Sequence, residues 1–321
     1  MKQQKLTKND PTMTPERYLN PFVDYGFKKL FGTEENKDLL ISLLNALIGG
    51  EDPIKDLSYK NVERIGDLVG TRTNYFDVYC ETSSGEEFIV EMQNSWQPFF
   101  KDRTLYYAAK PIRDQGNIGM EESDDHKDGN GEEDKKRNKG WDFRLKNVYV
   151  VAMMNFKLPN KEYAEDSFLH KIQLMDVEDF HVFYDKLTLI YLELPKVDKA
   201  KLDLNTPLGR WLHALNGLYY YDAKPIELKE AVFEKLFHQA ELAMLTPDQD
   251  LAYERSRKVY LDTLNEVRGA HILGHREGLA EGTAKTKLEM AKKMLTLGLE
   301  MDTVTQVTGL SDKEILNPPH Q

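Results

Sequence analysis

Apolar positions along this chain recur with two periods, and the change of period predicts where helices and strands lie. Five leucines between residues 39 and 47 have the spacing of one apolar helix face, and Gly49 and Gly50 end that helix. Residues 75–81 and 88–92 alternate as strands do, with the turn sequence Ser-Ser-Gly between them. This pattern predicts two antiparallel strands joined in a hairpin.

The segments around the hairpin complete one core. Residues 54–65 predict an extended strand, and residues 97–116 predict a helix that is broken near Pro111 and Gly116. Two further apolar runs are typical of buried strands: 145–156 and 186–197. As far as the first of these two runs, the predicted order is helix, strand, strand, strand, helix, strand, and this order indicates an α/β fold.

Composition divides the chain into parts. Residues 1–19 predict a flexible N-terminus that precedes a core at 20–204. Inside the core, residues 117–140 are dominated by charged residues and glycine, which cannot form a packed interior, so we predict a disordered insertion there. Residues 205–321 have a helical period and predict a helical C-terminal region.

The last segment of that region, "LTLGLEMDTVTQVTGLSDKEIL", predicts a pair of short helices. Gly309 lies at the turn between them, and Ser311 with Glu314 forms the pattern of a capping box. Two interpretations stay open. The pair is either a small helix-turn-helix-like unit that contacts DNA or a packing element without such a role.

Charge and cysteine content narrow the classes of function. The chain has 321 residues and a net charge of −11, which argues against a protein that coats nucleic acid through its overall field. An enzyme that contacts DNA through one local basic surface remains compatible with that charge. The single cysteine, Cys80, excludes an internal disulfide and a cysteine-based zinc cluster.

Several kinds of site and segment are absent from the sequence. It contains no GxxxxGK[ST] loop, so we expect no nucleotide cofactor, and no HExxH spacing, so we expect no zinc enzyme. The first twenty residues lack the apolar core of a signal peptide, and no run is long enough to span a bilayer. We therefore expect a cytoplasmic protein without membrane contact.

Two carboxylates lie in the most apolar parts of the predicted hairpin. Asp77 stands between Phe76 and Val78, and Glu91 lies near the end of the second strand. An unpaired buried carboxylate costs free energy, and two acids brought together by antiparallel pairing repel each other unless a cation lies between them. Mg²⁺ or Mn²⁺ suits such oxygen ligands, and Gln93 points to the same face as Glu91 and could orient water or phosphate. The alternative is a pair of ordinary acids on half-exposed strands.

Several sequence blocks in order resemble one known family. "DYGFKKLFG", "NKDLLISLLNALI", "YFDVYCETSSGEEFIVEMQ" and "DRTLYYAAK" resemble the PD-(D/E)XK nuclease superfamily, in particular its transposase-like, recombination-promoting branch. The resemblance covers roughly residues 20–200, and the charged helical tail is also similar to that branch. It implies a restriction-endonuclease-like core followed by a helical C-terminal region.

The resemblance assigns roles to single residues. Asp77 matches the first metal-binding acid, and Glu91-Met92-Gln93 matches the (D/E)xK element, in which the Met92 backbone carbonyl is a further ligand. Gln93 departs from the superfamily pattern, where lysine is commoner, and supplies a dipole in place of a charge. Asp24 matches another acidic position of the branch; its alternatives are a helix N-cap and an ion pair with Lys28.

One basic residue joins these candidates. Arg103, at the start of the helix after the hairpin, could neutralise a DNA phosphate, although solvated charge is the commoner role of such a residue.

The leading hypothesis is a Mg²⁺-dependent DNA endonuclease, with Mn²⁺ as a substitute, that acts in recombination, transposition or defence. One metal centre per chain suggests a homodimer for cutting both strands. The rival is a catalytically weak or inactive nuclease-fold scaffold that binds DNA or protein through its helical tail. A third hypothesis is a self-associating helical protein with an incidental α/β domain.

Overall fold

The computed structural model describes residues 17–50, 52–60, 76–124, 144–159 and 163–316, and for residues 117–124 it describes the backbone alone. The chain forms two compact units, residues 1–260 and 261–321. No described helix combines the length and apolar character that crossing a bilayer requires.

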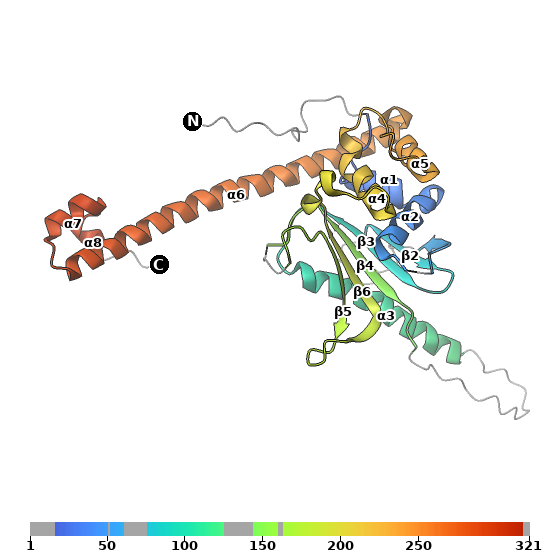
Figure 1. Ribbon diagram of the computed structural model, residues 1–321, viewed down its shortest axis with the longest axis horizontal. Helices are drawn as coiled ribbons and strands as arrows, with labels where there is room; N and C mark the ends of the chain where they lie inside the picture. The colour runs from blue at the N-terminus through green and yellow to red at the C-terminus, as the bar shows by residue number, and fades with distance from the viewer. Residues whose placement is uncertain (1–16, 51, 61–75, 125–143, 160–162, 317–321) are drawn as a thin grey trace, which may run out of the picture. The chain divides into compact units, whose positions relative to one another are not determined.

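A six-stranded sheet is the centre of the first unit (Figure 1). Its strands are β1 (Leu57–Tyr59), β2 (Val78–Thr82), β3 (Glu87–Gln93), β4 (Val148–Met154), β5 (Leu169–Met175) and β6 (Val182–Glu193), in the order β1-β2-β3-β4-β6-β5. The first three strands pair antiparallel, whereas β3, β4 and β6 run parallel, so their carboxyl ends lie at one edge. The prediction of an α/β fold is confirmed.

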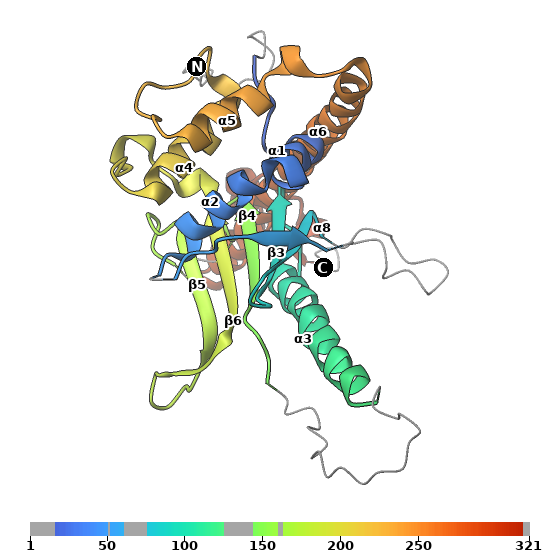
Figure 2. The ribbon, with the colours of Figure 1, turned by 90° about the vertical axis from the view of Figure 1, so that its right-hand side faces the viewer.

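Helices cover both faces of this sheet. In the first unit they are α1 (Asp24–Phe31), α2 (Lys37–Ile48), α3 (Phe100–Asp124), α4 (Pro207–Gly217), α5 (Ala231–Ala240) and the beginning of α6 (Pro247–Thr296). Figure 2 shows α3 on one face of the sheet and α1, α2, α4 and α5 on the other. Each layer encloses its own core of buried side chains.

Side chains of β3 alternate between the two faces of the sheet, so this strand contributes to both cores. Phe88, Val90 and Met92 contribute to the core beneath α1 and α2, while Ile89 contributes to the core beneath α3. Because side chains alternate between the faces of a strand, Glu87, Glu91 and Gln93 lie on the α3 side. Two of these three polar side chains are buried.

The prediction that the helix after the hairpin breaks near Pro111 and Gly116 is wrong. Helix α3 is continuous from Phe100 to Asp124 with Pro111 inside it, and Ala108 and Ile112 pack on the sheet. Tertiary packing can outweigh the lost hydrogen bond and steric cost of one proline.

Helix α3 also corrects the predicted insertion. Residues 117–124 belong to the helix, because helix propagation adds one hydrogen bond per residue and does not require burial. Residues 125–140, the rest of the predicted disordered segment, lie outside the described part of the chain.

Two other segments differ from the prediction. Residues 17–19, which we assigned to the flexible N-terminus, pair with residues 240–242, and Tyr18 and Leu19 are buried. Burial of two large apolar side chains explains why this segment is ordered. Strand β5 was not predicted, because its pattern is half exposed and irregularly spaced.

Helices α4 and α5 pack against the same core as α1 and α2. Trp211 of α4 is buried, lies against Phe31 and Phe233, and donates from Nε1 to Ser42 Oγ at 3.0 Å. Through these contacts α4 and α5, which belong to the helical region predicted at 205–321, are part of the first unit. The second unit contains the end of α6.

Two short helices complete the second unit: α7 (Met301–Thr308) and α8 (Asp312–Leu316). Gly309 between them has a φ of 71°, a left-handed conformation that favours glycine. The predicted capping box is present, because Ser311 N donates to Glu314 Oε2 at 2.8 Å and Glu314 N donates to Ser311 Oγ at 3.4 Å. A small core of Ala291, Val304 and Ile315 holds these elements together.

Candidate active site

The hairpin of β2 and β3 brings Asp77 and Glu91 face to face. Val78 pairs with Val90, so the residues just beyond this pair, Asp77 and Glu91, meet at the end of the ladder. Asp77 N donates to Glu91 Oε1 at 3.2 Å, and Met92 N donates to Asp77 Oδ2 at 2.7 Å. Asp77 lies at a bend before β2, not in the middle of a strand as we predicted.

Gln93 extends this pair towards α3. Its Nε2 donates to Glu91 Oε2 at 2.9 Å, and its Oε1 accepts from Arg103 Nη2 at 2.6 Å. Arg103 also donates to Gln97. The two partners of Gln93 determine which way its amide points, because only the nitrogen can donate to a carboxylate. Both predicted residues, Gln93 and Arg103, therefore belong to one network with Glu91.

Asp24 and Lys28 approach the pair from α1. Lys28 Nζ lies 2.8 Å from Asp24 Oδ1 and 3.9 Å from Asp77 Oδ1. Asp24 therefore forms the ion pair that we gave as one alternative, whereas the N-cap alternative is wrong because Val23 is the N-cap and Asp24 is the first helical residue. Besides burial, the neighbouring Asp24 carboxylate also acts to raise the pKa of Asp77.

Lys28 is the site residue that our sequence analysis missed. It was named only as a partner for Asp24, although the structure places it beside Asp77 as well. Its i,i+4 spacing to Asp24 was the available signal, but nothing local pointed to Asp77, which is distant in sequence.

The environment of the two acids disfavours their charged forms. Burial raises the pKa of Asp77 to about 6, although its hydrogen bond from Met92 and the charge of Lys28 act in the opposite direction. Burial and the nearby charge of Asp77 raise the pKa of Glu91 to about 8. Burial lowers the pKa of Lys28, but the contacts with Asp24 and Asp77 outweigh it and the net change is upward. The pair therefore keeps protons at pH values where isolated carboxylates have released them.

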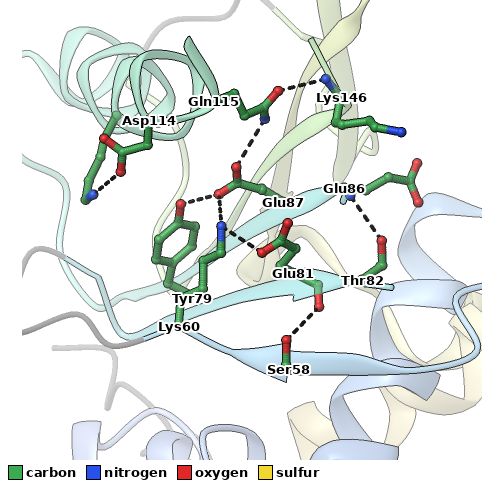
Figure 3. Close-up of polar contacts among 11 residues, drawn as sticks. Ser58, Lys60, Tyr79, Glu81, Thr82, Glu86, Glu87, Asp114, Gln115 and Lys146 are labelled. Atoms are coloured by element: carbon green, nitrogen blue, oxygen red, sulfur yellow. Dashed lines mark hydrogen bonds and ion pairs between the residues drawn. The ribbon is translucent and has the colours of Figure 1, made fainter. Parts of the chain in front are cut away.

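A second buried carboxylate on the same strand face has a different environment (Figure 3). Glu87 is 2% exposed, and its Oε2 accepts from Lys60 Nζ at 3.1 Å and from the Tyr79 hydroxyl. Its Oε1 accepts from Gln115 Nε2 at 3.1 Å. Glu87 thus accepts from three donors, one of which is the Lys60 cation, as a structural buried acid requires.

Glu193, at the carboxyl end of β6, follows the same rule. It is fully buried, and its Oε1 lies 2.6 Å from Lys196 Nζ and 2.9 Å from His170 Nε2. Its Oε2 accepts from Leu158 N at 2.8 Å. Asp77 and Glu91 have no such close cation among the described residues: Lys28 Nζ lies 3.9 Å from Asp77, and Arg103 reaches Glu91 only through Gln93.

The donor set at this pair fits a hard divalent cation. The two carboxylates supply the hard oxygen ligands that Mg²⁺ and Mn²⁺ favour. Their raised pKa values indicate that their ionised forms lack compensating positive charge, which a bound divalent cation would provide. The N–H of Met92 faces Asp77, and in a strand the carbonyl of the same residue points to the same side. The Met92 carbonyl is therefore a suitable third oxygen.

A different acidic group lies at the turn between β5 and β6. Ligand atoms of Asp176, Asp179 and His181 lie within 4.8 Å of one another. Asp176 Oδ1 accepts from the backbone N–H of Glu178 and of Asp179, which lowers the pKa of Asp176. These hydrogen bonds are typical of a surface turn. The group is therefore an acidic cluster away from the pair of Asp77 and Glu91, and it is suitable as a control for metal binding.

The raised pKa values predict how stability depends on pH. Between about pH 4.5 and 8 the folded state keeps protons on Asp77 and Glu91 that the unfolded state has released, so the metal-free protein should lose stability as the pH rises. We expect this pair to contribute a decrease of about 1–3 kcal/mol across that window. Urea unfolding at pH 5, 6.5 and 8 in chelator, on the wild type and Glu91→Gln, isolates the contribution; an equal pH dependence in both proteins would contradict it.

Two family models match the chain. The model of the PD-(D/E)XK nuclease family transposase matches residues 21–270, and the model of the C-terminal HTH domain of the Rpn/YhgA-like nuclease family matches residues 284–319. The first match includes every predicted site residue, and the second includes α7, α8 and the end of α6. No curated protein and no solved structure gave a significant match.

Proposed function

The chain belongs to the PD-(D/E)XK nuclease family transposases, and on that premise we propose that it is a DNA endonuclease that depends on a divalent metal. The observation that carries this proposal is the pair of Asp77 and Glu91, two acids in contact with raised pKa values. Lys28 of α1 approaches Asp77, and Arg103 of α3 approaches Glu91 through Gln93. We place its activity in DNA recombination, transposition or defence.

Asp77, Glu91 and the Met92 carbonyl would hold Mg²⁺, or Mn²⁺ in its place. A bound ion of this kind polarises the phosphodiester and lowers the pKa of an attacking water. The chain's own contribution is to keep both carboxylates at one point. The hydrogen bonds from Asp77 N and Met92 N do this, because each ties one acid to the backbone of the other strand.

In most of the superfamily a lysine stands where this chain has Gln93. Here Gln93 and Lys28 together would replace that lysine: Gln93 would orient water or phosphate, and Lys28 would supply the positive charge. The Gln93 amide, held by Glu91 and Arg103, can orient water or a phosphate oxygen. The Lys28 ammonium brings the positive charge that Gln93 lacks to the same carboxylate.

The C-terminal unit supports DNA as the partner, since its match is to a helix-turn-helix domain. Of the two interpretations of the terminal helices, contact with DNA is therefore the one that we favour. With one proposed metal site per chain, cutting both strands at one place calls for two copies, and we propose a homodimer for that step.

The rival function is a nuclease-fold scaffold that binds DNA without cutting it. Gln93 in place of lysine and the net charge of −11 favour it. The scaffold predicts no metal binding at Asp77 and Glu91, and metal binding therefore separates the two functions.

Divalent metal is expected to stabilise the wild-type protein and to allow cleavage. Thermal unfolding in chelator should shift upwards on adding Mg²⁺, Mn²⁺ or Ca²⁺, by an amount that follows ligand concentration over Kd. Supercoiled plasmid should be nicked with Mg²⁺ or Mn²⁺ and should stay intact in chelator.

Asp176→Asn is the control for this experiment, because it weakens the acidic turn between β5 and β6. It should leave both the metal-dependent shift and the nicking unchanged. A shift that disappears in Asp176→Asn would place metal binding at that turn, and a folded wild type with neither shift nor nicking would favour the scaffold.

A further inference from the structure

Exposed aromatic side chains flank the proposed active site where β3 leads into α3. Trp96 is 45% exposed, Phe99 is 80% exposed and Tyr106 is 67% exposed. Phe99 O accepts the Arg103 N–H at the start of α3, and Arg103 and Tyr106 follow at helical spacings of four and three residues. Phe99 immediately precedes α3, and Tyr106 lies in the second turn of that helix. Between them in sequence, the Arg103 guanidinium lies over the rings of Phe100 and Tyr107, 5.6 and 5.9 Å from their centroids.

The backbone of Phe99 is unfavourable for the residue that it carries. Its φ is 62°, which a side chain with a Cβ adopts only against steric resistance and which glycine adopts freely. Burial of the ring does not offset this cost, because the ring projects into solvent. Strain of this kind beside a candidate active site indicates a function for the side chain that it presents.

Hydrogen bonds connect this aromatic segment directly to the catalytic network. Arg103 donates to Gln97, one residue after Trp96, and also to Gln93, which contacts Glu91. A phosphate held at Asp77 and Glu91 would therefore have its neighbouring nucleotides near the segment between Gln97 and Arg103, which carries the exposed Phe99. Every nucleobase has a face that stacks on an aromatic ring, and a nearby cation interacts with the phosphate backbone.

We propose that Trp96, Phe99 and Tyr106 stack on unpaired nucleobases next to the scissile phosphate, so that the preferred substrate is DNA with single-stranded or locally unpaired nucleotides. This inference rests on the proposed nuclease function and names its substrate class. Unpaired bases expose their faces, whereas in a duplex those faces are covered by neighbours and stacking on protein first requires unstacking. The segment thus selects DNA by the accessibility of its bases.

A second exposed phenylalanine provides a matched control. Phe180, at the turn between β5 and β6, is 76% exposed and has a φ of 55°. That turn precedes the first residue of β6, while the proposed site lies at the carboxyl end of the parallel strand β3. Phe99 and Phe180 therefore share exposure and backbone conformation but lie at opposite ends of the sheet.

The test compares Phe99→Gly with Phe180→Gly in the full-length protein. Binding of a labelled oligo-dT of about 12 nucleotides, and of a mixed-sequence duplex of equal length, is measured by fluorescence anisotropy in EDTA so that no cleavage occurs. Loss of one base–aromatic stack corresponds to roughly a 5- to 150-fold weaker affinity. We expect this loss for oligo-dT in Phe99→Gly, less than a twofold change for the duplex, and no change in Phe180→Gly.

Tryptophan fluorescence gives an independent measurement of stacking. Of the chain's three tryptophans, Trp96 is half exposed, Trp211 is buried and Trp141 lies outside the described residues. Oligo-dT should quench the wild-type emission, and Trp96→Phe should remove the part of the quenching that stacking on Trp96 causes. Thermal unfolding shows whether each variant is folded; Phe99→Gly should be at least as stable as the wild type, because glycine relieves the strained φ.

Three results would overturn the proposal: unchanged oligo-dT affinity in Phe99→Gly, an equal loss for oligo-dT and duplex, or an equal loss in Phe180→Gly. Plasmid nicking with Mn²⁺ is measured in parallel. Nicking with unchanged oligo-dT binding in Phe99→Gly would refute the stacking surface and leave the nuclease function standing. If Phe99→Gly selectively loses oligo-dT binding but the wild type does not nick plasmid, the stacking surface stands and the nuclease function is refuted.

Discussion

Glu91→Gln is expected to reduce metal-dependent DNA cleavage by about 10³-fold or more and, at the same time, to stabilise the metal-free protein. The loss follows because glutamine keeps the shape of the side chain but removes the charge that would hold the metal, whose contribution to such reactions is several kcal/mol. The gain follows because Glu91 is buried beside Asp77, and their mutual repulsion disappears with the charge.

The expected gain in the free energy of unfolding depends on pH. Near neutral pH a protonated Glu91 resembles glutamine, so the difference between wild type and variant is small. Above pH 8 the wild-type side chain is ionised, and Glu91→Gln should be more stable by about 1–3 kcal/mol. Urea unfolding at pH 6 and pH 9 in chelator, together with plasmid nicking in Mn²⁺, measures both effects.

Glu87→Gln is the matched control, since Glu87 lies on the same face of the same strand and is equally buried. It removes a charge that Lys60 compensates, so it should destabilise the protein. Opposite signs for the two variants are the expected result. If Glu91→Gln destabilises the protein as Glu87→Gln does, Glu91 is a structural acid, and that result contradicts the proposed metal site.

The same two residues show what sequence analysis could and could not predict. The pattern of residues 88–92 predicts a strand, and the two-residue period of a strand places Glu87, Glu91 and Gln93 on one face. Antiparallel pairing across a short turn brings Asp77 near Glu91. Alternation alone does not separate Glu87 from Glu91, and only the resemblance of Glu91-Met92-Gln93 to the (D/E)xK element singles out Glu91. The difference depends on Lys60 and Gln115, which reach Glu87 from β1 and α3 through contacts that only the fold creates.

The errors in the predicted elements have a similar origin. Pro111 predicts a helix break from local chemistry, but packing of α3 on the sheet outweighs it. The second strand of the hairpin was predictable because both its faces have a regular pattern, whereas β5 has one register shift after another and exposed apolar residues at its end. Lys28 reaches Asp77 across 49 residues of sequence, a contact that local spacing does not encode.

Lys28→Met is expected to slow DNA cleavage by roughly 10²- to 10³-fold, the usual loss when one group that stabilises transition-state charge is removed. Lys28 brings a positive charge to Asp77, and Gln93 cannot replace that charge. Two roles of Lys28 predict different results for metal binding. If Lys28 only neutralises the acids until metal binds, Lys28→Met should bind Mn²⁺ more tightly and cut DNA at the wild-type rate with saturating metal.

If Lys28 stabilises the charge of the transition state, cleavage by Lys28→Met should be slow even at saturating Mn²⁺. A positive charge introduced on β3 should then restore part of the rate. In the double variant Lys28→Met with Gln93→Lys, the new ammonium starts from the position whose amide now contacts Glu91, so it should restore part of the lost rate. Lys29→Met is the control, because a neighbouring residue on α1 points about 100° away around the helix. Single-turnover cleavage and Mn²⁺ titration by calorimetry measure rate and affinity separately. Wild-type cleavage by Lys28→Met at saturating Mn²⁺ would remove Lys28 from the chemistry and leave Gln93 and Arg103 as the groups that contact the phosphate.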